Sequence, residues 1–149
     1  MPHSAGAGGR HGARRSKQAT VIGRAAEKLF YDFLLASAPA ELQSKIRWLA
    51  NEGLTPGYDI QDERDPTAVT AYEVKGTTGT EFRSIEITAN ELECAQRMGE
   101  QYAIVLLSGV GSPSPKFQTV RNPDRWLAQK AAVVVPTVFS MTFAADAIE

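Results

Sequence analysis

Cysteine and histidine are scarce in this chain. Its single cysteine, Cys94, excludes an internal disulfide and any zinc site built from several cysteines. Both histidines, His3 and His11, lie in the glycine- and arginine-rich start of the chain, where no regular element is predicted to fix a metal-ligand geometry. An unpaired cysteine is typical of a reducing compartment, so we expect a cytoplasmic location. Cys94 itself is expected to be a buried structural thiol.

Long apolar runs are also absent. No run approaches the roughly 20 residues that a membrane-spanning helix needs. The first 17 residues contain no apolar core of the kind found in secretory signals. With 149 residues, of which 43% are hydrophobic and 22% charged, the chain can form one globular domain with a sizeable core. We expect residues 1–18 to be a disordered basic arm and residues 19–149 to be a single domain.

Acidic residues are missing from the first 18 residues, which hold four of the 16 lysines and arginines. The rest of the chain is therefore net acidic, although the whole chain has a formal charge of only -1. Broad attraction to phosphate would have to come from the arm or from a few local cations. The arm is open to two interpretations, a solvated tail or a phosphate-contacting segment. An acidic body remains compatible with a site in which carboxylates bind a metal ion.

The hydrophobic pattern predicts alternating helices and strands. Residues 18–37 show one helical apolar face, made by Ile22, Ala26, Leu29, Phe30 and Phe33. Thr88 and Glu91 form a capping box that opens a second helix ending near Met98, and a short helix is predicted at residues 122–129. Strands are predicted at residues 45–50, 58–60, 68–75, 82–88, 102–107, 117–120, 132–135 and 138–143.

The run at residues 102–107, YAIVLL, is apolar at nearly every position, as in strands covered on both faces. We expect it to be a central strand. The element order as a whole predicts an α/β fold, an α+β sandwich with a mixed central β-sheet flanked by helices.

The most specific pattern is the segment from Gly57 to Gly76, GYDIQDERDPTAVTAYEVKG. It places Asp59 at one short apolar run. If residues 68–75 form a strand, side chains alternate in direction, so Glu73 and Lys75 share one face. A carboxylate and an amine on one strand face, with a second carboxylate upstream, is how a hydrolase of phosphodiesters holds a divalent cation and places an ammonium beside the attacked phosphate.

This pattern predicts a metal-dependent catalytic site. Asp59 and Glu73 would be ligands of Mg²⁺ or Mn²⁺, and the Val74 carbonyl would add a backbone oxygen. Lys75 would orient the attacking water and balance the charge that builds on the phosphate. Tyr72 and Val74 would point to the opposite face of the strand.

Other interpretations stay open for several of these residues. Glu73 and Lys75 could be an ordinary surface ion pair, worth about 0 to 1 kcal/mol. Glu27 lies at the flank of the first helix face, either solvated or leaning towards the metal cluster. The remaining acidic residues of the segment lie in a predicted hairpin loop at residues 61–66 and are interpreted as solvated charges: Asp62, Glu63 and Asp65.

Five segments, in order between residues 20 and 110, resemble the PD-(D/E)XK nuclease-like superfamily and, more narrowly, the domain at the C-terminal end of the plant NO VEIN protein, which also occurs in bacterial defence and restriction proteins. These segments are GRAAE at residues 23–27, GYDI at 57–60, YEVKGT at 72–77, ITANE at 87–91 and QYAIVLL at 101–107.

The resemblance implies that residues 19–149 form a single nuclease-like domain. It also implies a restriction-endonuclease-like core with Asp59, Glu73 and Lys75 as the catalytic set. It also suggests Glu27 as an auxiliary metal ligand. The proline of the superfamily motif departs from the pattern, because Pro56 stands three residues before Asp59.

We therefore expect a Mg²⁺- or Mn²⁺-dependent endonuclease that hydrolyses phosphodiester bonds, with DNA as the expected substrate, in defence, restriction or DNA processing. A helicase or ATPase partner and a homodimer are further expectations, the latter because cutting a duplex involves both strands. The alternatives are a catalytically inactive module of the same fold that binds nucleic acid or protein, and an α/β protein with neither activity.

Overall fold

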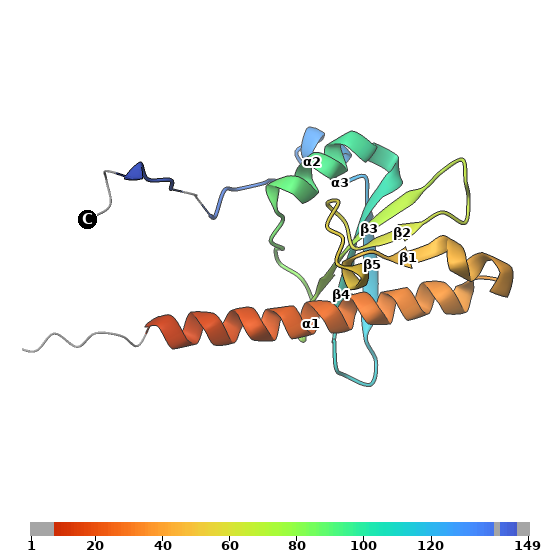
Figure 1. Ribbon diagram of the computed structural model, residues 1–149, viewed down its shortest axis with the longest axis horizontal. Helices are drawn as coiled ribbons and strands as arrows, with labels where there is room; N and C mark the ends of the chain where they lie inside the picture. Colours follow the sequence, from red (N-terminus) through yellow and green to blue (C-terminus); the bar gives the residue numbers. More distant parts are fainter. Residues whose placement is uncertain (1–7, 139–140, 146–149) are drawn as a thin grey trace, which may run out of the picture.

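A five-stranded mixed sheet lies between helices in the computed structural model, which describes residues 8–138 and 141–145. Figure 1 shows α1 along one face of the sheet, with α2 and α3 against the other. The elements are α1 (Gly8–Ser37), β1 (Ile46–Trp48), β2 (Ile60–Asp62), β3 (Thr70–Gly76), α2 (Ala89–Met98), β4 (Tyr102–Ser108), β5 (Lys116–Arg121) and α3 (Pro123–Ala128), with short 3-10 helices at Ala40–Lys45, Ala50–Glu52 and Gly99–Gln101.

The strands are arranged in chain order across the sheet, β1-β2-β3-β4-β5. All neighbours are antiparallel except β3 and β4, which are parallel. A parallel pair needs a long crossover connection, and the segment containing α2 provides it. This arrangement confirms the predicted class, a mixed sheet flanked by helices. It also confirms that residues 102–107 form a strand whose side chains are mostly buried.

The sheet has a separate apolar core on each face. The core beneath α1 contains Phe30 and Leu34 of the helix together with Val74 and Val105 of the sheet. The core beneath α2 contains Cys94, whose predicted burial is confirmed, and Tyr102. Successive side chains of β3 point to opposite faces of the sheet, so they alternate between these two cores.

The apolar face of α1 is rotated from the predicted one. Ala26, Phe30 and Leu34 are buried at four-residue spacing, whereas Leu29 and Phe33 are 40% and 47% exposed. The prediction placed both in the core and omitted Leu34. Two neighbouring rows of apolar residues on α1 both have helical spacing. Packing against the sheet decides which row is buried. Phe33 keeps partial cover because its ring packs edge-on against the ring of Phe117 on β5, with centroids 4.7 Å apart.

The first helix begins at Gly8, ten residues before the predicted start at Gln18. Residues 8–18, which composition assigns to an irregular arm, are thus helical in the structure. Arginine, alanine, lysine and glutamine, which all favour helix, together make up six of these eleven residues, against three glycines. His11 lies in the helix, and His3 lies outside the described residues.

Three segments predicted as strands are not strands in the described residues. Residues 82–88 are extended, and Ile85 and Ile87 pack against the α2-side core, but the segment crosses the sheet face as part of the β3–β4 connection. Residues 132–135 and the described parts of 138–143 are also irregular, with Val133 79% and Val138 86% exposed. An apolar run forms a strand only where a neighbouring strand pairs with it. Residues 139 and 140 lie outside the described range.

Within the described residues, no helix is long and apolar enough to cross a membrane.

Helix α1 approaches β3 most closely at Gly76. A Cβ atom at this position would lie 2.6 Å from the Cβ of Ala26 and 3.2 Å from the carbonyl oxygen of Ile22. The glycine therefore lets the helix lie directly on the end of the strand that carries Glu73 and Lys75.

The substitution Gly76→Ala is expected to lower the free energy of unfolding by about 1 to 3 kcal/mol, because the added methyl group overlaps atoms of α1. Gly23→Ala is the matched control, since a Cβ there meets nothing within 4 Å. Inside a helix it is expected to raise stability by about 0.5 to 1 kcal/mol. Urea unfolding of both variants measures the difference, and equal stabilities would contradict the close approach.

Candidate active site

Asp59 is positioned at the entry of β2 by main-chain bonds to its neighbours. Its backbone N–H donates to the Tyr72 carbonyl at 2.9 Å, and its own carbonyl accepts from the Ala50 N–H at 3.1 Å. Its side-chain Oδ2 accepts a hydrogen bond from the Val74 N–H at 2.8 Å. Continuing the register that pairs Ile60 with Tyr72 brings Asp59 beside Glu73. The two carboxylates predicted to share a cation are thus brought together.

The predicted alternation along β3 is confirmed. Tyr72 and Val74 face α1, where the Tyr72 ring meets the Phe30 ring edge-on with centroids 5.1 Å apart. Glu73 and Lys75 face the opposite side, and their Oε1 and Nζ atoms are 2.8 Å apart. The side chain of Glu73 is only 6% exposed and that of Lys75 19% exposed, so this is not an open surface pair. The surface-pair alternative therefore does not describe their environment.

Glu91 is a further site residue that sequence reasoning did not place there. Its Oε2 atom lies 2.9 Å from Lys75 Nζ, so the lysine sits between two carboxylates. The predicted capping box is confirmed, with reciprocal bonds between Thr88 and Glu91. The capping signal identified Glu91 as a helix cap, but its approach to β3 depends on how α2 packs on the sheet.

Glu27 lies at the side of the same site. It is half-buried on α1, and its Oε2 accepts a hydrogen bond from Trp48 Nε1 at 2.7 Å. Among the described residues, no group of three or more histidine, cysteine, aspartate or glutamate side chains is arranged to hold a metal ion. Asp59, Glu73 and Lys75 are adjacent, and Glu27 borders them from α1.

A hollow of about 660 Å³ opens over these side chains. Residues of α1, the end of β3 and the extended segment 81–86 line it, among them Glu27, Asp59, Glu73 and Lys75. Its size is in the range of ligand pockets. Both carboxylates and the lysine therefore border an open space at the surface.

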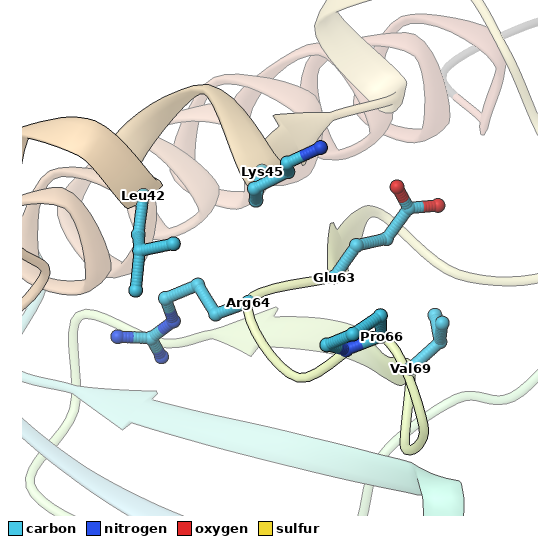
Figure 2. Close-up of a pocket in the computed structure, with 6 residues that line it drawn as sticks. All are labelled: Leu42, Lys45, Glu63, Arg64, Pro66 and Val69. Carbon is cyan, nitrogen blue, oxygen red and sulfur yellow. The ribbon is translucent and has the colours of Figure 1, made fainter.

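A second hollow, of about 460 Å³, lies at the β2–β3 hairpin and contains none of the predicted site residues. Figure 2 shows Arg64 and Glu63 pointing to different sides of it. Arg64 is held by Asp62, with 2.7 Å between Nη2 and Oδ2, and Glu63 accepts a hydrogen bond from Gln61. Arg64 therefore already has an ionic partner and Glu63 a hydrogen-bond donor.

The loop interpretation of Asp62 is wrong. Asp62 is the last residue of β2. It is only 7% exposed, because the Arg64 guanidinium covers its carboxylate. Asp65 remains an exposed turn residue, and its Oδ1 accepts from the Thr67 N–H at 2.9 Å. The sequence pattern does not distinguish a paired strand end from a solvated loop where charges follow one another.

A family model described as "Protein NO VEIN, C-terminal" matches residues 21–120, which extend from the middle of α1 into β5. The chain belongs to the NO VEIN C-terminal family. No curated protein and no solved structure gives a match. The matched region of this NO VEIN C-terminal domain includes every residue of the candidate site.

In the NO VEIN C-terminal domain, burial and neighbouring carboxylates disfavour the charged forms of Asp59 and Glu73 and raise the pKa of each. Burial raises the pKa of Asp59 to about 7; the hydrogen bond from the Val74 N–H opposes this, and the charge of Glu27 adds to it. Burial, with the neighbouring Asp59, raises the pKa of Glu73 to about 8. Burial alone would lower the pKa of Lys75, but Glu73 and Glu91 raise it above its ordinary value. The lysine therefore stays charged, while the carboxylate pair retains protons near neutral pH.

The carboxylate oxygens of this pair are the kind of ligand that a hard divalent cation takes. Among the described residues, no donor bonds to Oδ1 of Asp59 or to Oε2 of Glu73, so each carboxylate keeps one oxygen available. Mg²⁺ takes oxygen ligands, commonly one or two carboxylates with substrate phosphates and waters. Two adjacent carboxylates repel one another when both are ionised, which is why they retain protons. A divalent cation that replaces these protons removes the repulsion.

Proposed function

We propose that this NO VEIN C-terminal domain is a metal-dependent nuclease of the PD-(D/E)XK type that hydrolyses phosphodiester bonds, with DNA as its expected substrate. The observation that carries the proposal is the adjacency of Asp59, Glu73 and Lys75 at an open hollow, with 2.8 Å between Glu73 and Lys75. The order of these residues along the chain agrees with the resemblance to that superfamily.

Asp59 and Glu73 would hold the cation, Mg²⁺ or Mn²⁺, through their available oxygens. The Val74 carbonyl is a third oxygen, because the two polar groups of one strand residue point to the same side and the Val74 N–H points at Asp59. Glu27, as an auxiliary ligand, would contribute from α1 through a bound water. When bound, the cation polarises the phosphate and lowers the pKa of a coordinated water.

Lys75 would contact the phosphate that is attacked. Its ammonium carries a full charge beside the carboxylates, in a site that is largely shielded from water. There it balances negative charge that builds on the phosphate oxygens and orients the attacking water by a hydrogen bond. A preorganised charge of this kind acts without a reorganisation cost at the moment of reaction.

The chain as a whole offers little general attraction to nucleic acid, since its formal charge is -1. Substrate capture would therefore depend on local cations such as those in residues 8–18, or on a partner. We propose a helicase or ATPase as such a partner, in defence, restriction or DNA processing. A homodimer would supply the two sites needed to cut both strands.

Incubation with supercoiled plasmid and with single-stranded DNA, with and without Mg²⁺ or Mn²⁺, tests this function. Cleavage is expected only with metal, and Asp59→Asn is expected to abolish it. Asp32→Asn is the matched control, because this exposed carboxylate pairs with Lys28 on α1, away from the site. Metal-independent cleavage, or equal cleavage by Asp59→Asn, would contradict the proposal. Metal binding without cleavage would instead indicate an inactive binding module of the same fold.

A further inference from the structure

We propose that Glu91 is a positioning residue that holds Lys75 in place when Glu73 is bound to a cation. The inference rests on the proposed nuclease function, and it concerns a residue on a different element from the three residues of that site. Lys75 Nζ has two carboxylate partners, Glu73 at 2.8 Å and Glu91 at 2.9 Å. Of these two partners, Glu73 is the one that the β2–β3 register brings beside Asp59, where the cation would bind.

The Glu91 carboxylate is fixed independently of the lysine. Its Oε2 atom accepts a hydrogen bond from the Thr88 N–H at 3.0 Å as well as from Lys75 Nζ. In return the Glu91 N–H donates to Thr88 Oγ1 at 3.2 Å. This reciprocal capping box constrains the side chain at the first turn of α2. The glutamate is therefore already oriented towards β3 through the capping box.

The start of α2 is in turn locked to the segment that leads to Asp59. Gly57 has a φ of +109°, and a Cβ at this position would lie 2.8 Å from the Cβ of Cys94 and 3.0 Å from the carbonyl oxygen of Asn90. The Tyr102 hydroxyl, from β4, donates to the Gly57 carbonyl at 2.9 Å. Helix α2 and the strand entry that carries Asp59 are thus packed against each other without a gap.

These contacts give Glu91 a distinct task. A cation at Asp59 and Glu73 would compete with Lys75 for the Glu73 carboxylate. A lysine has a flexible four-carbon stem and no rigid geometry of its own, so it would otherwise lose its position. Glu91 remains 2.9 Å from Nζ and would keep the ammonium directed at the substrate. The cap of α2 is therefore also a support for Lys75.

A purely structural role of Glu91, as a helix cap, is the competing explanation. Two variants separate the roles. Glu91→Gln keeps an acceptor for the Thr88 N–H, because glutamine also serves in capping boxes, but it loses the negative charge facing Lys75. Thr88→Ala removes the other half of the capping box and leaves the Glu91–Lys75 contact.

Acylation of lysines by an amine-reactive ester, followed by mass spectrometry, reads the position of Lys75 without using activity. In the unaltered protein Lys75 is expected to react slowly compared with Lys28, whose side chain is 62% exposed. Glu91→Gln is expected to raise Lys75 labelling several-fold, more so with saturating Mn²⁺, and to leave Lys28 unchanged. Thr88→Ala is expected to lower the melting temperature without changing Lys75 labelling.

Unchanged Lys75 labelling in Glu91→Gln, or an equal rise in Thr88→Ala, would overturn the proposal. The result of labelling without metal does not depend on whether the protein cleaves DNA. The plasmid assay therefore reveals a failure of the nuclease function separately from a failure of this proposal. Where cleavage is present, Glu91→Gln is expected to lower kcat by about tenfold or more with little change in KM, because misplacement of a catalytic group costs rate rather than binding.

Discussion

Replacing Lys75 with alanine is expected to lower the rate of metal-dependent DNA cleavage by about 10²- to 10³-fold, the range measured when one preorganised stabilising group is removed from an active site. The reason is the position of its ammonium, 2.8 Å from Glu73 and 19% exposed at the floor of the open hollow. Among the described residues that line the hollow, Lys75 is the only lysine. Initial rates of plasmid nicking at saturating Mg²⁺ measure the effect.

Lys28→Ala is the matched control for this substitution. Lys28 also pairs with a carboxylate, Asp32, at 2.6 Å, but on the exposed side of α1. Its removal is expected to leave cleavage unchanged and to alter stability by less than about 1 kcal/mol. Thermal unfolding of both variants shows whether each is folded. A folded Lys75→Ala protein that cleaves as fast as the unaltered protein would remove Lys75 from the catalytic set.

Raising the pH is expected to destabilise the metal-free protein. The folded-state pKa values of Asp59 and Glu73, about 7 and about 8, lie above those of an unfolded chain, which are near 4. Between these limits the folded state binds more protons than the unfolded state, so the free energy of unfolding falls as pH rises. The loss begins above about pH 4 and is complete above about pH 8.

The size of this loss is on the order of a few kcal/mol, since one pKa unit corresponds to about 1.4 kcal/mol. Urea unfolding in the presence of a chelator, at a series of pH values between 5 and about 8.5, measures it. Asp59→Asn is expected to flatten the pH dependence, because the neutral amide does not titrate and no longer repels the Glu73 carboxylate. Glu27 and Glu91 remain as charged neighbours in both proteins. Stability that rises with pH in the unaltered protein would contradict the raised pKa values of this carboxylate pair.

Divalent cations are expected to reverse the loss at high pH. A ligand that binds only the folded state stabilises it by about 2.7 kcal/mol at a concentration 100 times its dissociation constant. Mg²⁺ or Mn²⁺ should therefore restore the stability of the unaltered protein near pH 8 and leave Asp59→Asn unaffected.

Much of the site could be predicted from local sequence. Strand alternation alone placed Glu73 and Lys75 on one face, because the period of two in β3 allows no other arrangement once the strand exists. The short connection between β2 and β3 made an antiparallel hairpin the expected pairing, and this pairing brings Asp59 beside Glu73. Both inferences depend on neighbouring residues in the chain.

The predictions that failed depend on distant parts of the chain. Leu29 and Leu34 are both apolar, and only the docking of α1 on the sheet decides that Leu34 is buried. Asp62 is buried because the Arg64 side chain folds back over it, which composition does not reveal. Glu91 approaches Lys75 across 16 residues of chain, and the contact exists because α2 packs on the sheet beside β3. Tertiary packing sets each of these outcomes.

Calorimetric titration of the metal-free protein with Mn²⁺ tests the central claim most directly, namely that Asp59 and Glu73 form a divalent cation site. One binding event is expected for the unaltered protein and for Asp32→Asn, and none for Asp59→Asn or Glu73→Gln at the same concentrations. Proton release is expected to accompany binding near pH 7, because burial and mutual repulsion raise the pKa values of the carboxylate pair, which therefore retains protons there in the absence of metal. Absence of binding by the unaltered protein, or equal binding by Asp59→Asn, would contradict the account.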